Sequence, residues 1–150
     1  MTSKRKEIIL PLCSKLVLKI SILLGFYIIV HGHLSPGGGF QGGVIVASAI
    51  VIYYLANGRE KTLNTFNIKR LENTEKISAL SFIFIASLGI IYGVPFFTNI
   101  LSKGIVGSVF SSGSIFFMNF AVGLKVLSGV SVLILVIISS LREGDERIDN

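Results

Sequence analysis

The fold is decided by residues 113–141, which read GSIFFMNFAVGLKVLSGVSVLILVIISSL. This run exceeds the roughly 20 apolar residues that a helix needs to cross the hydrocarbon of a bilayer. Working outward from it, three further apolar runs lie at residues 8–30, 40–56 and 77–97. We therefore predict an all-α integral membrane protein, with residues 1–150 forming a single domain of four transmembrane helices.

Composition also favours the membrane. Of the 150 residues, 51% are hydrophobic and 15% are charged, whereas an average soluble domain has about 25% charged residues. The net charge of +6 does not indicate nucleic-acid binding, because the basic residues flank the apolar runs and do not gather on one soluble face. The lone cysteine, Cys13, excludes an intrachain disulfide, and we expect neither a metal nor a cofactor.

The distribution of lysine and arginine predicts the orientation of the chain. Basic residues are concentrated before the first run, in the segment 57–76 and after the last run, whereas the opposite side carries only Lys103. Since cytoplasmic segments are enriched in Lys and Arg, both termini and the segment 57–76 are expected in the cytoplasm of a cell-membrane protein. We interpret residues 57–76 as a solvated connector. The basic start is typical of a secretory signal, but no small-residue cleavage site follows it, so we expect the first run to be retained.

The segment between the first two runs, residues 31–43, reads HGHLSPGGGFQGG. Its glycines fit the phosphate-binding pattern G-x-G-x-x-G, but no strand precedes them and no Walker lysine follows, so we reject that interpretation. Pro36 cannot continue a helix and can begin one, with Ser35 as the N-cap. The remaining motif residues, together with Pro36, are predicted to form a packing surface at membrane depth against another polypeptide: Gly37, Gly38, Gly39, Phe40, Gly42 and Gly43.

Two histidines, His31 and His33, lie at the end of the first run. Imidazole titrates near neutrality, so both are candidates for carrying protons during ion translocation. Alternatively, they bond the free carbonyl groups where the first helix ends. Two histidines without a third ligand are weak evidence for a metal, and we predict none.

The string from Gly32 to Gly43 closely resembles the signature of the MnhB/MrpB family, the B subunit of Mrp-type multi-subunit Na⁺/H⁺ antiporters. Residues 119–126, NFAVGLKV, resemble the last helix of that family. Related subunits occur in archaeal membrane-bound hydrogenases and sulfane-sulfur reductase complexes. The resemblance implies a four-helix accessory subunit with no catalytic residues, which helps to form the region of ion passage while larger subunits hold the main proton channels.

Lys125 is the one charge deep in the last apolar run. A lysine at the centre of a membrane helix costs about 2.5 to 3.5 kcal/mol on insertion scales, so it should face protein, water or a carboxylate. All eight acidic residues lie outside the central parts of the predicted helices, so the expected carboxylate belongs to a partner subunit. Lys125 is therefore the first candidate for ion translocation. Snorkelling of its side chain to the membrane surface is the alternative.

These observations favour a subunit of an ion-translocating complex that is not itself an enzyme. Its expected partners are the bilayer, the ions Na⁺ and H⁺, other antiporter subunits and, in a redox-driven setting, hydrogenase or sulfur-reductase subunits. A small self-associating transporter or channel is the alternative, because Lys125 and the glycines also suit self-association. A membrane enzyme that uses His31 and His33 is rejected, because no nucleophile or full ligand set lies nearby.

Overall fold

The computed structural model describes residues 2–148 except 106 and 108, and it describes the side chains of residues 9–140 with the same two exceptions. These residues form five helices: α1 (Thr2–His31), α2 (Gly38–Asn57), α3 (Arg59–Thr65), α4 (Ile68–Ile91) and α5 (Ser114–Ile148). Four segments are long and apolar enough to cross a membrane: Ile9–His31, Gly38–Asn57, Ile68–Ile91 and Ser114–Ser140. The predicted all-α class with four helices of spanning length is confirmed.

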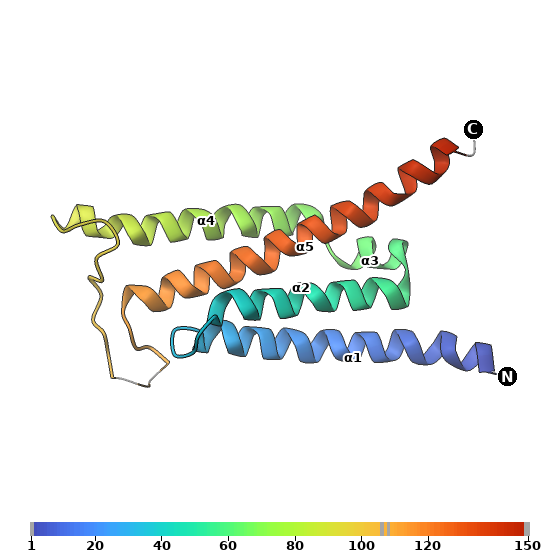
Figure 1. Ribbon diagram of the computed structural model, residues 1–150, viewed down its shortest axis with the longest axis horizontal. Coiled ribbons are helices and arrows are strands. Elements are labelled where there is room, and N and C mark those ends of the chain that lie inside the picture. Colours follow the sequence, from blue (N-terminus) through green and yellow to red (C-terminus); the bar gives the residue numbers. More distant parts are fainter. Residues whose placement is uncertain (1, 106, 108, 149–150) are drawn as a thin grey trace.

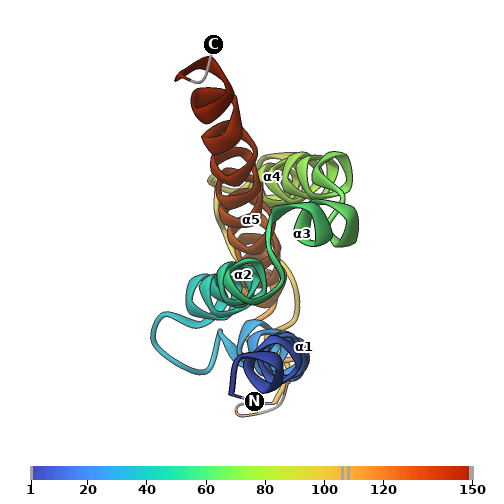
Figure 2. The ribbon, with the colours of Figure 1, turned by 90° about the vertical axis from the view of Figure 1, so that its right-hand side faces the viewer.

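The four long helices lie in a row and do not form a closed bundle. Along the row, α1 packs on α2, α2 packs on α5, and α5 packs on α4. Figure 1 shows α5 crossing the row diagonally, and Figure 2 shows α1 and α4 at its opposite edges. Both faces of the row therefore carry exposed apolar side chains, which is expected where lipid or another subunit is the solvent.

Different segments of the chain lie at the two ends of the row. The start of α1, helix α3 and the end of α5 lie together at one end, here called the α3 end. The α1–α2 turn and the segment 92–113 lie at the other, here called the loop end (Figure 1). The segments predicted to share one side of the membrane thus meet at the α3 end. The basic side chains of residues 4–6, 142 and 147, on which part of that prediction rests, are outside the described residues.

Helix α4 begins earlier and ends earlier than the predicted 77–97. It begins because Asn67 caps it, its side chain accepting a hydrogen bond from the backbone N–H of Arg70. It ends in a Schellman motif: Gly93 has φ +72° and donates to the carbonyl of Ile90, and Val94 donates to that of Gly89.

The interpretation of residues 57–76 as a solvated connector is corrected in its secondary structure only, because every residue there except Thr62 is exposed or half-buried. Most of that segment is helical, divided between α3 and the first turns of α4. Arg59, the first residue of α3, donates to the carbonyl of Ser139 and ties α3 to α5. The buried side chain of Thr62 donates to the carbonyl of Gly58, which precedes α3.

A glycine-rich break separates α1 from α2, as predicted, but α2 does not begin at Pro36. Gly37 is the N-cap, and its φ of +86° is a backbone conformation that glycine adopts without steric cost. Its carbonyl accepts the first hydrogen bond of the helix, from the N–H of Gln41. The chain has to reverse here within a few residues, so tightly that a Cβ on Gly38 would collide with the backbone of Gly32. The predicted capping by Ser35 is wrong for this reason.

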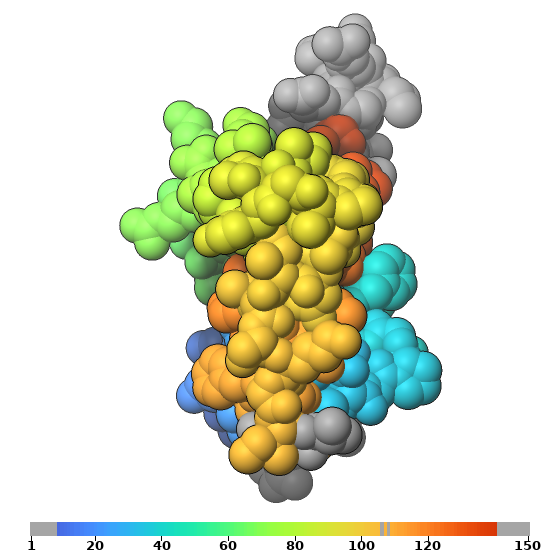
Figure 3. Space-filling model, turned by 90° about the vertical axis from the view of Figure 1, so that its left-hand side faces the viewer, coloured from blue at the N-terminus to red at the C-terminus, as the bar shows by residue number. Residues whose placement is uncertain are grey.

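The segment 92–113 crosses the loop end from α4 toward α1, as Figure 3 shows for its described residues. Asn99 anchors it at the start of α5. The Asn99 side chain donates to the carbonyl of Ser112 and accepts from the N–H of Ser114, the first residue of α5. The segment thereby satisfies one of the free N–H groups with which every helix begins.

Candidate functional site

Three motif glycines, Gly39, Gly42 and Gly43, pack against other helices of this chain, whereas the sequence predicted contact with another polypeptide. A Cβ on Gly42 would lie 2.5 Å from the carbonyl oxygen of Gly25 on α1. A Cβ on Gly43 would lie 2.8 Å from the carbonyl oxygen of Gly123 on α5, and one on Gly39 would meet the backbone of Asn119. Because these glycines have no side chain, the backbone of α2 contacts the backbones of α1 and α5 directly.

Other residues of the motif are still available to a neighbour. Pro36, Gly37 and Phe40 are exposed, with Phe40 at 58% of its full surface. For these three, contact with a partner subunit stays a prediction. For Gly38, Gly39, Gly42 and Gly43, which are buried, the prediction is corrected to packing within the chain.

Asn119 joins the two helix ends at the break. Its side-chain Nδ2 donates to the carbonyl of Ile29 on α1 over 2.8 Å, and its Oδ1 accepts from the N–H of Gly39 on α2 over 2.9 Å. Both are groups that a helix end leaves without a partner inside the helix. This role was not predicted, although a side-chain amide in an apolar run is itself a signal, because it needs partners in hydrocarbon.

We expect Asn119→Leu to destabilise the isolated chain by about 1 to 3 kcal/mol. The apolar isostere leaves the N–H of Gly39 without a partner and removes one of two donors to the carbonyl of Ile29, which keeps its bond from the N–H of Gly32. The lost partner of the Gly39 N–H carries a desolvation cost. Thermal unfolding of the purified protein in detergent measures the change. The matched control is Asn64→Leu at an exposed position of α3. Equal melting of the two variants would contradict the bridging role.

The two histidines bond nearby groups at the loop end. His31 Nδ1 lies 2.9 Å from the carbonyl oxygen of Tyr27, one turn back on α1, and the two rings stack with centroids 4.2 Å apart. His33 Nε2 lies 3.1 Å from the hydroxyl of Ser111, and its ring meets Phe116 edge-on. His31 thus bonds a carbonyl one turn back inside α1, and not one of the free carbonyls of the helix end, so both predicted roles of His31 stay predictions. His33 instead ties the α1–α2 turn to the segment that precedes α5.

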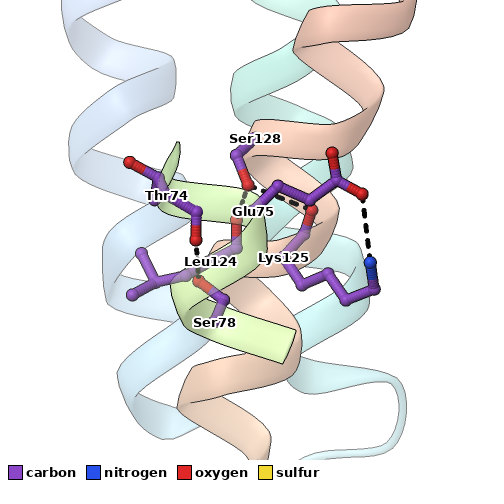
Figure 4. Close-up of polar contacts among 6 residues, drawn as sticks. All are labelled: Thr74, Glu75, Ser78, Leu124, Lys125 and Ser128. Carbon is purple, nitrogen blue, oxygen red and sulfur yellow. Dashed lines mark hydrogen bonds and ion pairs between the residues drawn. The ribbon is translucent and has the colours of Figure 1, made fainter. Parts of the chain in front are cut away.

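Lys125 forms an ion pair within the chain. Its Nζ donates to Oε1 of Glu75 on α4 over 3.1 Å, as Figure 4 shows. The carboxylate expected from a partner subunit is thus supplied here by this chain, which corrects that prediction. Glu75 was assigned to a connector because the start of α4 was placed too late. Snorkelling of Lys125 toward the membrane surface stays a prediction, because half of its side chain is exposed and Glu75 lies in the charged first turns of α4.

Small residues bring α4 and α5 close together around the pair. A Cβ on Gly129 would lie 3.3 Å from the Glu75 carboxyl carbon, so glycine leaves room for that carboxylate. The buried hydroxyls of Ser78 and Ser128 donate to carbonyls of their own helices, at 2.7 Å from Thr74 O and from Leu124 O respectively (Figure 4). These two serine hydroxyls therefore lie between the two helices with their donors paired.

The pair stands apart from the histidines. Among the described residues, neither His31 nor His33 has a hydrogen bond to Lys125 or Glu75. Phe116, which touches the His33 ring, lies about 14 Å along α5 from Lys125 at the helical rise per residue. The three candidate residues for ion translocation thus do not form one cluster. The ion pair is the chemically distinctive feature of the spanning region.

Four helices of spanning length in an open row, with an ion pair between α4 and α5, define a multi-pass membrane protein. The family described as a domain related to the MnhB subunit of Na⁺/H⁺ antiporter matches residues 9–132. The chain belongs to this MnhB family, and the resemblance seen in residues 32–43 and 119–126 is confirmed.

Curated relatives agree with the family match. An uncharacterized protein of Methanocaldococcus jannaschii is 32% identical over 154 aligned residues, covering 93% of this chain and 58% of that protein. The B subunit of a Na⁺/H⁺ antiporter of Bacillus subtilis is 32% identical, with the match covering 64% of this chain and 66% of the relative. The mnhB2 protein of Staphylococcus aureus, a putative antiporter subunit in its own description, is 34% identical over 64% of this chain and 67% of its own length. The chain thus spans between about three fifths and two thirds of these relatives.

Proposed function

We propose that this chain is a non-catalytic membrane subunit of a multi-subunit Na⁺/H⁺ antiporter and that its Glu75–Lys125 pair lies in the region of ion translocation. The observation that carries the proposal is the pair itself, placed between two spanning helices of an MnhB-family chain. Ionisable residues within membrane spans are costly and mark ion pathways or contacts between subunits.

The pair has a chemical use in moving cations. The Glu75 carboxylate attracts a cation, and the Lys125 ammonium next to it repels one, so a cation that approaches the pair competes with Lys125 for the same oxygen atoms. A site of this kind can couple the position of a cation to the position of the Lys125 side chain.

The arrangement of the helices favours a subunit over an autonomous transporter. In the described residues the spanning helices lie in an open row, which does not surround a central path (Figure 2). A path for ions has to be completed by further helices, which we propose to be those of other antiporter subunits. Attachment of hydrogenase or sulfur-reductase subunits stays a prediction from the sequence.

Omitting this chain from the complex tests the proposal. The subunits of the antiporter are co-expressed with and without it in cells that lack other Na⁺/H⁺ antiporters, and Na⁺-dependent dissipation of a proton gradient is measured in membrane vesicles. We expect exchange in the full set and its loss when this chain is left out. Unchanged exchange without the chain would overturn the proposed function.

The proposed orientation places the α3 end in the cytoplasm and the loop end outside. In a Cys13→Ser background, single cysteines at Asn64 and Ser102, both exposed, should differ in their reaction with an impermeant thiol reagent added to intact cells. We expect labelling at Ser102→Cys and protection at Asn64→Cys until the membrane is opened. The reverse pattern would overturn the orientation.

A further inference from the structure

The Glu75–Lys125 pair is only partly satisfied within the chain. Lys125 carries three N–H donors and uses one of them on Glu75, and the described residues supply no bond to the second oxygen of Glu75. The two side chains, Lys125 and Glu75, remain 50% and 35% exposed. Hydrocarbon cannot accept the remaining hydrogen bonds of an ion pair, so lipid tails are an unsuitable cover for this surface.

An apolar groove adjoins the pair on the same helices. It has a volume of about 300 Å³ and is lined by Ala79, Phe82, Ile83, Ala121, Val122 and Lys125. Its alanines let another helix approach closely, and its depth accommodates an apolar side chain of that helix. Lys125 lines the groove with the carbon atoms of its side chain, which leads to the ion pair at the rim of the groove. The groove and the exposed N–H donors of Lys125 thus belong to one surface. On α5, the groove residues Ala121 and Val122 lie about one helical turn from Lys125.

We infer that this surface, the α4–α5 groove with the Glu75–Lys125 pair at its rim, binds a transmembrane helix of another antiporter subunit. That helix presents an apolar side chain to the groove and, about one turn away, a carboxylate or amide oxygen to Lys125. The inference rests on the proposed function, because it takes a partner subunit to exist. The surplus of donors on Lys125 selects an acceptor on the partner.

A purely apolar partner helix does not fit this surface. It would bury the ion pair while leaving the donors of Lys125 unpaired, which costs more than leaving them in water. A second copy of this chain would fit only if it brought an acceptor to the rim. The partner helix therefore needs both an apolar side chain for the groove and a hydrogen-bond acceptor for Lys125.

Photo-crosslinking in the assembled complex tests the inference. A benzophenone amino acid is placed at Ile83, which lines the groove and is 57% exposed, and at Leu23 on α1, which is 76% exposed at the far edge of the row. After irradiation, the crosslinked peptide is identified by mass spectrometry. We expect Ile83 to capture one transmembrane helix of another subunit, with an Asp, Glu, Asn or Gln within one turn of the attachment point, more efficiently than Leu23.

The possible results distinguish a failure of the docking inference from a failure of the proposed function. Capture at Ile83 of lipid alone, of a second copy of this chain, or of a helix without such a polar residue would overturn the inference. If that complex still exchanges Na⁺ for H⁺ and still requires this chain, the proposed function stands without the groove. If exchange does not require this chain, the proposed function fails and the inference falls with it.

Filling the groove gives an independent readout. Ala79→Phe places an aromatic ring in the space meant for the partner, whereas Leu80→Phe changes a neighbouring residue that is 66% exposed and does not line the groove. We expect Ala79→Phe to lower the yield of the captured subunit about tenfold, the effect of a moderate steric penalty, and Leu80→Phe to leave it unchanged. Equal yields in the two variants would contradict docking in the groove.

Discussion

Gly39→Leu and Gly42→Leu are expected to prevent stable packing of α1, α2 and α5 within the chain itself. A Cβ at Gly42 would lie 2.5 Å from the carbonyl oxygen of Gly25, and one at Gly39 would collide with the backbone of Asn119. Backbone atoms of two packed helices cannot move aside as a flexible side chain can. We expect a loss of about 3 kcal/mol in the free energy of unfolding, at the upper end of overpacking effects.

The measurement is thermal unfolding of the purified chain in detergent, compared with Ser48→Leu. Ser48 lies on α2 and is exposed, so the same added volume meets no packed backbone there. Wild-type melting of Gly39→Leu and Gly42→Leu, with a defect only in the recovery of partner subunits, would contradict intrachain packing. That result would restore the contact with another polypeptide predicted from the sequence.

Lys125→Ala and Glu75→Gln are expected to reduce Na⁺/H⁺ exchange by at least about tenfold while the complex is still recovered. Lys125→Ala leaves the Glu75 carboxylate without its ion pair, and Glu75→Gln removes the negative charge opposite Lys125 while it keeps an oxygen that can accept a hydrogen bond. A tenfold loss corresponds to about 1.4 kcal/mol. Transport is measured as Na⁺-dependent proton flux in proteoliposomes that hold the purified complex.

Further variants separate charge from packing. Lys125→Arg keeps the charge and should retain more exchange than Lys125→Ala, although a guanidinium occupies a different shape. The control is Lys19→Ala on α1, where the side chain is exposed at the edge of the row. Exchange at the wild-type rate in Lys125→Ala would remove the ion pair from the mechanism and leave the subunit a structural role.

The elements of the fold could be predicted because membrane helices are recognised by length and apolarity. The first and last residues of each helix were harder to predict. The start of α4 depends on Asn67, one of several asparagines in the segment, and its end depends on Gly93, inside an apolar run. Hydropathy alone does not register either cap, so the predicted 77–97 missed the first turns of α4. The row-like packing of the helices has no signal in a single sequence.

The candidate site was predicted in part for the same reason. Lys125 is visible in the sequence, because a charge inside an apolar run has to be explained. Its counter-ion Glu75 was missed, because it lies in turns of α4 that were assigned to a connector. The glycine motif was taken as a packing surface against another polypeptide, and a single sequence does not show which helices its glycines meet. Only the three-dimensional arrangement shows that Gly39 and Gly42 meet helices of the same chain.

The most direct test of this account is Na⁺-driven proton flux measured in three sets of proteoliposomes. One set holds the purified chain alone, the second holds the complete antiporter complex, and the third holds the complex assembled without this chain. We expect flux only in the second set, because an open row of four helices requires the helices of other subunits to complete an ion path. Na⁺-driven proton flux by the chain alone would contradict the account and establish a self-associating transporter in its place.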